Sequence, residues 1–294
     1  MNILIFSITC FLSVTLYSQN LNVEHINSLG QKMLLGEIDK SGLNKEHYKT
    51  WFSKNYGDFE PDEAIIESLR GKLNDYSITI FMGTWCGDSK LQVPRFYKII
   101  EALQFPKHQL KVIAVNNDYE MYKQSPQHEE KGLNIHRVPT FIFYKNGQEI
   151  NRIVEHPVES LEEDILSIVN DNNYKPNFEI VRTVNTILKE SGVGGLKRKQ
   201  KLIIEHLGDK TKSYSELNTY GSILRTTNKL AEAIAVYKLN LKLFPETPRA
   251  YQSLAIAYSA QNKAEKAETI LKKALRKFPQ HKALEKSLEQ LKTK

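Results

Sequence analysis

Hydrophobic residues in the first half of the chain form short runs that are bounded by polar residues. Runs rich in β-branched and aromatic residues predict buried strands. They occupy residues 76–82, 110–115, 140–144 and 148–154. Asn146 and Gly147 separate the last two runs, and both tolerate positive φ. We therefore expect a two-residue hairpin turn at this point.

Apolar residues at helical spacing fill the intervals between these strands. They predict helices at 61–73, where proline and acidic residues occupy the first turn, at 88–103 and at 160–170. Pro94 lies inside the second of these and predicts a kink. Residues 116–134 form a polar excursion that we expect to be partly helical. The whole stretch 21–73 is predicted to be mixed and mostly helical.

Strand patterns end after the polar residues 170–177, and everything from Phe178 onward has helical spacing. Phe244-Pro245 recurs as Phe278-Pro279, a period of 34 residues. At this shift large apolar residues align with large ones and small residues with small ones. Small residues let two helices approach closely, and large ones fill the groove between them. The pattern predicts a repeated helical pair.

The segments "LNTYGSIL…AEAIAVY…FP" and "YQSLAIAY…AEKAETI…FP" resemble the tetratricopeptide repeat (TPR). The resemblance implies an all-α domain over 173–294 with repeats at 213–246 and 247–280 and a polar capping helix at 281–292. Residues 178–207, with a glycine-rich break, are expected to supply a degenerate first repeat. The resemblance also implies a groove for a protein partner. The predicted partner-binding residues are Tyr220, Leu224, Tyr251 and Tyr258.

Composition and charge narrow the class of protein. A chain of 294 residues has room for about two domains. A hydrophobic content of 40% is ordinary for globular proteins and argues against disorder. The formal charge of +7 is spread along the chain, and no nucleic-acid-binding module accompanies it. We interpret it as a solvated basic face and expect no nucleic-acid partner.

Residues 1–19 are mostly apolar and carry no charged side chain. The run is short for a membrane span and ends in small polar residues, which favours an export signal cleaved near Ser18. An N-terminal anchor is the alternative, and only then would the protein contact a membrane. We expect an exported protein with a periplasmic or other extracytoplasmic location. Cys10 would be removed with the segment, so the mature chain would keep one thiol, Cys86, and no internal disulfide.

The stretch "FMGTWCGDS" places Cys86 between a predicted strand and a predicted helix. A helix N-terminus favours a thiolate, which is the reactive form of cysteine. Trp85 would shield one side of the sulfur, and Gly87 would leave the approach open. Asp88 or Ser89 is expected to begin the helix. The alternative interpretation is an inert, buried cysteine at a strand end.

The segments "TIFMGTWCGDS" and "RVPTFIFYKNGQEI", the proline eight residues after the cysteine, and the closing helix resemble the thioredoxin fold. The resemblance covers about 75–170. It implies an α/β domain over 20–172, with a central mixed sheet flanked by helices and a helical N-terminal extension. It also implies a cis peptide bond at Pro139 that faces the sulfur. Val138, Pro139 and Thr140, together with Trp85, Gly87 and Asp88, would form the substrate platform.

Two positions depart from the thioredoxin pattern. Ser89 replaces the second, resolving cysteine, and Ile80 replaces the buried carboxylate that the family places six residues before the nucleophile. Cys86 can still attack a disulfide, but Ser89 cannot displace the captured group, so release needs an external thiol. Ser89 would then hydrogen-bond or polarise the thiolate. The expected activities are isomerisation, monothiol reduction or covalent capture.

The sequence thus supports more than one function. The first hypothesis is thiol–disulfide exchange on exported proteins, with protein thiols and disulfides or a small thiol such as glutathione as reaction partners. The alternative is a binding or redox-sensing module that recruits a partner through its TPR-like groove and tethers it at Cys86, and a third treats the thioredoxin-like part as a retired scaffold. No cofactor or metal is expected, because the histidines are scattered, and His136 is interpreted as a surface residue.

Overall fold

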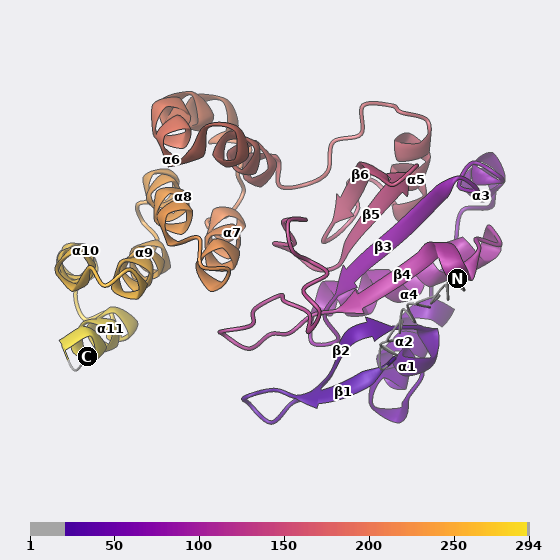
Figure 1. The fold of residues 1–294 in the computed structure, drawn as a ribbon, viewed down its shortest axis with the longest axis horizontal. Coiled ribbons are helices and arrows are strands. Elements are labelled where there is room, and N and C mark those ends of the chain that lie inside the picture. The colour runs from indigo at the N-terminus through magenta and orange to yellow at the C-terminus, as the bar shows by residue number, and fades with distance from the viewer. Residues whose placement is uncertain (1–20, 293–294) are drawn as a thin grey trace, which may run out of the picture.

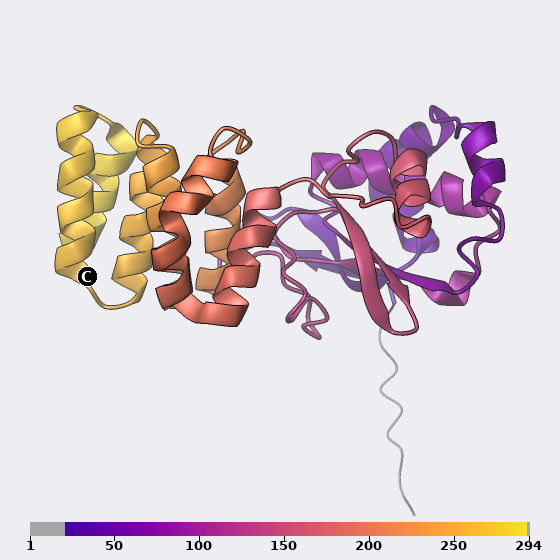
Figure 2. The ribbon, with the colours of Figure 1, turned by 90° about the horizontal axis from the view of Figure 1, so that it is seen from above.

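The computed structural model describes residues 21–292, which form a sheet with its helices followed by a run of paired helices (Figure 1). Figure 2 shows these two parts side by side along the long axis of the molecule. The predicted export segment 1–19 lies outside the described residues. Within 21–292, every helix is too short or too polar to cross a membrane. The predicted class, an α/β domain followed by an all-α repeat domain, is confirmed.

Six strands form one mixed sheet in the order β1-β2-β4-β3-β5-β6. Strands β3 and β4 are parallel, and all other neighbours are antiparallel. The strands are β1 (Val23–Ile26), β2 (Lys32–Ile38), β3 (Tyr76–Met82), β4 (Leu110–Ala114), β5 (Thr140–Lys145) and β6 (Gln148–Val154). Asn146 and Gly147 have φ of 52° and 74°, as the hairpin prediction requires. The four predicted strands are present within one residue of their expected ends.

The β1–β2 hairpin corrects the expectation that residues 21–73 are mostly helical. Strand β2 contains Met33, Leu34 and Leu35, three successive apolar residues that also suit a helix. Its conformation is decided by long-range pairing, because Gly36 lies opposite Ala114 of β4. Tertiary context therefore overrides local propensity at this edge of the sheet.

One face of the sheet is covered by helices. Side chains such as Ile78 and Ile80 of β3 form a core with the apolar faces of α2, α4 and α5. Asp62 and Ser160 cap α3 and α5 by accepting hydrogen bonds from main-chain N–H groups of the first turn. The helices in this part are α1 (Lys40–Leu43), α2 (Glu46–Gly57), α3 (Glu63–Leu69), α4 (Gly87–Ala102) and α5 (Leu161–Val169), with a 3-10 turn at Lys107–Gln109.

The opposite face of the sheet is covered by the excursion 116–134. Phe81 and Ile142 point to this side and pack in a separate core cluster. The expected partial helix is absent from these residues, which form successive turns. Polar side chains accept hydrogen bonds from main-chain N–H groups in this segment. The side chain of Asn116 accepts from Asp118 N–H, and that of Glu130 accepts from Ser125 N–H. Such local bonds compete with helix formation.

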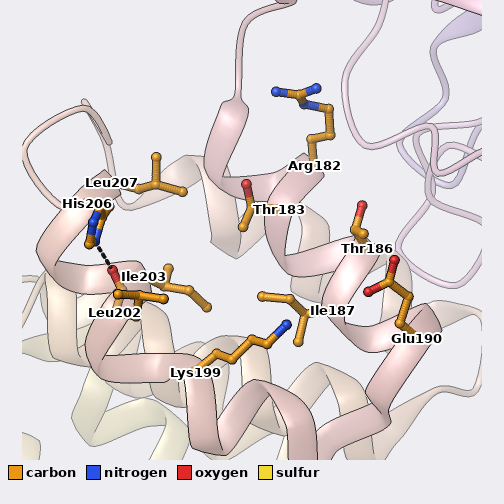
Figure 3. Close-up of a pocket in the computed structure, with 10 residues that line it drawn as sticks. All are labelled: Arg182, Thr183, Thr186, Ile187, Glu190, Lys199, Leu202, Ile203, His206 and Leu207. Carbon is orange, nitrogen blue, oxygen red and sulfur yellow. Dashed lines mark hydrogen bonds between the residues drawn. The ribbon is translucent and has the colours of Figure 1, made fainter.

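All the structure after Phe178 is helical, as predicted. The helices are α6 (Glu179–Leu207), α7 (Ser215–Thr226), α8 (Leu230–Leu243), α9 (Pro248–Ala260), α10 (Ala264–Lys277) and α11 (Lys282–Lys292). Gly192, with φ of 60° and ψ of −165°, divides α6 into two arms at the predicted break. A mostly apolar groove of about 560 Å³ lies between the arms, where Ile187 and Ile203 point toward each other (Figure 3).

The four residues predicted to bind a partner lie in the core of the helical part. Tyr220, Leu224, Tyr251 and Tyr258 are only 2%, 6%, 3% and 8% exposed. The positions that repeat with the 34-residue period are those that pack one helix on the next, so they are occupied by neighbouring helices. A partner would have to contact other side chains, and this corrects the expectation from the sequence.

Helices α7 and α8 pack so closely at Gly221 that replacing this glycine with alanine should destabilise the protein, although the same change usually stabilises a helix. A Cβ at Gly221 would lie 2.6 Å from the Tyr237 ring, whereas one at Gly194 would meet only the flexible end of Arg198. Glycine to alanine in a helix normally stabilises by up to about 1 kcal/mol. We expect Gly221→Ala to lower the free energy of unfolding by about 1–3 kcal/mol through overpacking.

Urea unfolding of the helical part, followed by far-UV circular dichroism, measures this difference. Gly194→Ala is the matched control and should be neutral or slightly stabilising. Equal stabilities for the two variants would contradict the close approach of α7 and α8.

Candidate functional site

Cys86 lies where β3 passes into α4. Its N–H donates to Gly83 O at 2.9 Å, which closes a turn, and its own carbonyl accepts from Lys90 N–H in the first turn of the helix. The backbone of Cys86 is extended, with φ of −89° and ψ of 130°, so the cysteine itself is the N-cap and α4 begins at Gly87. The helix thus starts slightly earlier than predicted. The partly exposed sulfur lies at the positive end of the helix.

The sulfur contacts the loop that precedes β5. The Cys86 thiol donates to Val138 O at 3.1 Å, and Asp88 Oδ2 lies 3.9 Å from the same sulfur. The peptide bond between Val138 and Pro139 is cis. Thr140 is buried, and its hydroxyl donates to Arg137 O at 2.7 Å. The residues expected to form one site therefore converge around the sulfur.

The two sides of the sulfur differ in access. The indole of Trp85 donates to Val115 O at 2.9 Å, and its ring packs near Tyr122 with centroids 6.2 Å apart. A Cβ at Gly83 would lie 2.5 Å from the Trp85 ring, so the indole is tightly held. A Cβ at Gly87 would meet nothing within 4 Å. Approach to the sulfur is open on the Gly87 side.

Ser89 is fully buried beneath the turn. Its hydroxyl oxygen accepts a hydrogen bond from Gly83 N–H at 3.2 Å. The expectation that Ser89 hydrogen-bonds the thiolate is therefore corrected, because this hydroxyl stabilises the turn. Ile80 is also fully buried and belongs to the core that packs against the helices. The position that the thioredoxin pattern gives to a carboxylate is apolar here.

Two buried basic residues near the site were not assigned a role from the sequence. Lys123 is 4% exposed, and its ammonium donates to His136 O at 2.8 Å and to Tyr122 OH at 3.0 Å. Burial lowers the pKa of Lys123 to about 7. This burial is not predictable from the local sequence, because a lysine in a polar segment is normally exposed.

His136 is buried, which corrects its interpretation as a surface histidine. It is 6% exposed, and its ring lies edge-on to Phe178 and Tyr220 of the helical part. Nδ1 lies 3.2 Å from Asn134 O, and Nε2 has no partner. Burial lowers the pKa of His136 to about 3, so the ring is neutral at ordinary pH.

The helical part contacts the loop before Pro139 directly. Arg137 donates to Glu155 at 2.8 Å and to the Ser215 hydroxyl at 2.9 Å, and its guanidinium lies 4.9 Å from the Phe178 ring centroid. Its neighbours in the chain are His136 and Val138, whose carbonyls bind Lys123 and Cys86. The loop that faces the sulfur is therefore packed between the sheet and the helical repeats.

No cluster of three or more histidine, cysteine, aspartate or glutamate side chains suited to a metal ion occurs within residues 21–292. The groups nearest the Cys86 sulfur are the carbonyl of Val138 and the carboxylate of Asp88, and the indole of Trp85 adjoins it in the chain. The arrangement suits nucleophilic chemistry at sulfur.

Comparison with known proteins agrees with this geometry. A thioredoxin family model matches residues 67–167, and a tetratricopeptide repeat model matches 224–291. A thioredoxin of Aspergillus fumigatus is 35% identical over 89 residues, which are 30% of this chain and 73% of that protein. The chain belongs to the thioredoxin family. Its thioredoxin domain is followed by TPR repeats.

Other thioredoxins align with the same domain. A thioredoxin of Gallus gallus is 28% identical over 116 residues, which are 40% of this chain and 98% of that protein. One of Malassezia sympodialis is 36% identical over 74 residues, which are 25% of this chain and 63% of that protein. The thioredoxin and tetratricopeptide repeat models match separate parts of the chain.

The buried neutral ring of His136 predicts a specific acid sensitivity. Below pH 6.5 the unfolded chain binds a proton at this histidine, and the folded chain does not until about pH 3. Stability from this residue is therefore complete above pH 6.5 and falls as the pH decreases. We expect His136→Gln to reduce the loss of unfolding free energy between pH 7 and pH 5 by about 1–2 kcal/mol.

Urea unfolding followed by tryptophan fluorescence measures this, because both tryptophans, Trp51 and Trp85, lie in the thioredoxin domain. The exposed His108 provides the control substitution, and His108→Gln should leave the pH dependence as it is in the native chain. An unchanged slope in His136→Gln would contradict the buried neutral ring.

Proposed function

We propose that the protein is an exported thiol–disulfide exchange protein that uses Cys86 as its only nucleophile. The observation that carries the proposal is the position of the sulfur at the N-terminal end of α4, partly exposed and 3.1 Å from Val138 O beside Pro139. The thioredoxin family membership supports redox chemistry at this position. The matched domain contains the whole site.

The proposed reaction begins when the Cys86 thiolate attacks one sulfur of a substrate disulfide. The substrate S–S bond breaks, a Cys86–substrate disulfide forms, and the other substrate sulfur leaves as a thiolate. An extended substrate segment would lie along the main chain of Val138 on the open side left by Gly87. Trp85 limits access from the other side.

Release of the captured group requires a second thiol from outside the domain. Ser89 is buried and bonded to Gly83, and a hydroxyl cannot displace a thiolate from a disulfide at neutral pH. A second cysteine of the substrate would complete an isomerisation, whereas a small thiol such as glutathione would complete a reduction. The absence of a carboxylate at Ile80 agrees with this scheme, because there is no resolving thiol for it to assist.

The TPR repeats would recruit the protein that undergoes exchange. A groove of about 1010 Å³ lies between Tyr119 and Glu120 of the excursion and helices α7, α9, α10 and α11. Arg225 lies 4.0 Å from the Tyr119 ring centroid and links the two walls. The apolar, uncharged residues 1–19 support export, after which Cys86 would be the only thiol.

A second candidate is a non-catalytic tether or redox sensor. The contact of Arg137 with Ser215 and Phe178 favours it, because the loop facing the sulfur is fixed to the partner-binding domain. In this function the mixed disulfide is the end product. Turnover with glutathione distinguishes the two candidates.

Substitutions of Cys86 and Ser89, the first and last positions of the C-G-D-S segment, test the proposed function. Cys86→Ala should abolish disulfide isomerisation in a glutathione buffer, since the nucleophile is lost. Ser89→Cys should create a dithiol that reduces insulin disulfides, with a rate at least about tenfold above that of the native chain. The measurements are refolding of a scrambled disulfide protein and insulin turbidity.

Ser89→Ala is the matched control, because it removes the same hydroxyl without adding sulfur. It should leave isomerisation within about threefold of the native rate. Full isomerisation by Cys86→Ala would exclude the proposed nucleophile, and a Ser89→Cys variant without reductase activity would contradict the position assigned to Ser89.

A further inference from the structure

The side chain of Lys123 is buried, and it has no role in the exchange reaction proposed above. Its N–H donates to Asn116 O, and the N–H of Asn116 donates to Gln124 O, so the main chain is fixed beside the end of β4. Trp85, which adjoins Cys86, is anchored to Val115 at the same place. The lysine side chain points inward from there to the carbonyl of His136, in the loop that contacts the sulfur.

The hydrogen-bond partners of this ammonium are neutral. They are the carbonyl of His136 and the phenol of Tyr122, whose pKa is raised by burial. Within residues 21–292 the ammonium forms no salt bridge. The carboxylate of Glu155 lies nearby but is paired with Arg137 at 2.8 Å. A buried cation without a carboxylate partner is costly, so a neighbouring anion would stabilise it.

Cys86 becomes such an anion when its thiol loses its proton, and its sulfur contacts Val138 O, two residues along the loop from the carbonyl that Lys123 binds. The Asp88 carboxylate, 3.9 Å from the sulfur, adds a second negative charge there. Burial has the largest effect on the pKa of Lys123 and lowers it, and Arg137 lowers it further, while Cys86 and Glu155 raise it. His136 is neutral and contributes no charge at ordinary pH. The thiol form of Cys86 donates to Val138 O, but the thiolate loses that donor and faces a carbonyl dipole. A positive charge behind the loop offsets this repulsion.

We propose that Lys123 is a positioning residue that stabilises the Cys86 thiolate through the loop residues 136–138 and supplies the charge balance of the site. The inference rests on the proposed exchange function. The Lys123 ammonium and the Cys86 thiolate form a coupled pair, in which each favours the charged form of the other.

The charge balance of the exchange step follows from this pair. Before attack the site holds one thiolate and one ammonium. After attack Cys86 is a neutral disulfide sulfur, and the negative charge departs with the substrate thiolate. Lys123 then binds its proton less tightly and releases it to bulk water near neutral pH, where the departing thiolate is protonated in turn. The step begins and ends without net charge in the site.

The rate of Cys86 alkylation by iodoacetamide as a function of pH tests the proposal. The full chain is used with Cys10→Ser, so that Cys86 is the only thiol. We expect Lys123→Met to lower the alkylation rate at pH 7 by about three- to tenfold, because a neighbouring charge changes thiol ionisation by up to about one unit. Lys131→Met, an exposed lysine of the same excursion, should change the rate by less than about twofold.

If Lys123 had only a structural role, Lys123→Met would change the free energy of unfolding and would leave the pH dependence of Cys86 alkylation unchanged. Superimposable profiles for the native chain and Lys123→Met would overturn the inference while leaving the exchange function intact. Loss of the exchange function would appear differently, as a native Cys86 that fails to react or a Cys86→Ala variant that retains isomerisation.

A second measurement needs no substitution at Lys123 and applies even where Lys123→Met does not fold. The pH dependence of the Lys123 Nζ chemical shift is recorded by NMR before and after Cys86 is alkylated with iodoacetamide, which leaves a neutral thioether. We expect the lysine to lose its proton at a lower pH after alkylation, by about half a unit or more. An unchanged titration of Lys123 would overturn the proposal.

Discussion

The contact between the Cys86 thiol and the carbonyl of Val138 is the interaction on which the site depends, because it joins the N-terminal end of α4 to the loop before β5. Hydrogen bonds from three different parts of the chain fix that loop, residues 136–138. Lys123 binds the carbonyl of His136, the Thr140 hydroxyl binds the carbonyl of Arg137, and Arg137 binds Ser215 of the helical repeats. The sulfur therefore faces a surface whose shape is fixed by both domains.

The absence of a second thiol changes what this site can do. Ser89 and Ile80 occupy the positions of the resolving cysteine and its assisting carboxylate, and both are fully buried structural residues here. In the proposed exchange reaction a captured group would remain on Cys86 until another thiol arrives, so the partner would set the lifetime of the mixed disulfide. If the repeats recruit a protein as proposed, such a long-lived intermediate would have a use, since recruitment raises the effective concentration of the second thiol.

The sequence predicted the features that local patterns determine. The four central strands, the Asn146-Gly147 turn, the cysteine at a strand-to-helix junction and the 34-residue helical repeat all follow from spacing within short windows. The β1–β2 hairpin did not, because β2 pairs with residues of β4 that lie 74 to 78 positions away in sequence. The burial of His136 and Lys123 was also not predicted, since it results from tertiary packing of residues 116–134 and of the helical repeats against these side chains. The periodic tyrosines and leucine of the repeats were identified correctly as repeat positions, but that same periodicity places them in the core.

Intact-mass spectrometry of the Cys10→Ser chain, after reaction with oxidised glutathione and removal of the glutathione that the exchange releases, is the most direct test that Cys86 is an accessible thiol without a resolving neighbour. We expect a single glutathione adduct on Cys86 that persists unchanged for hours and disappears when dithiothreitol is added. Failure of the folded protein to form the adduct, or spontaneous loss of the adduct in the absence of added thiol, would contradict an accessible lone sulfur without a resolving neighbour.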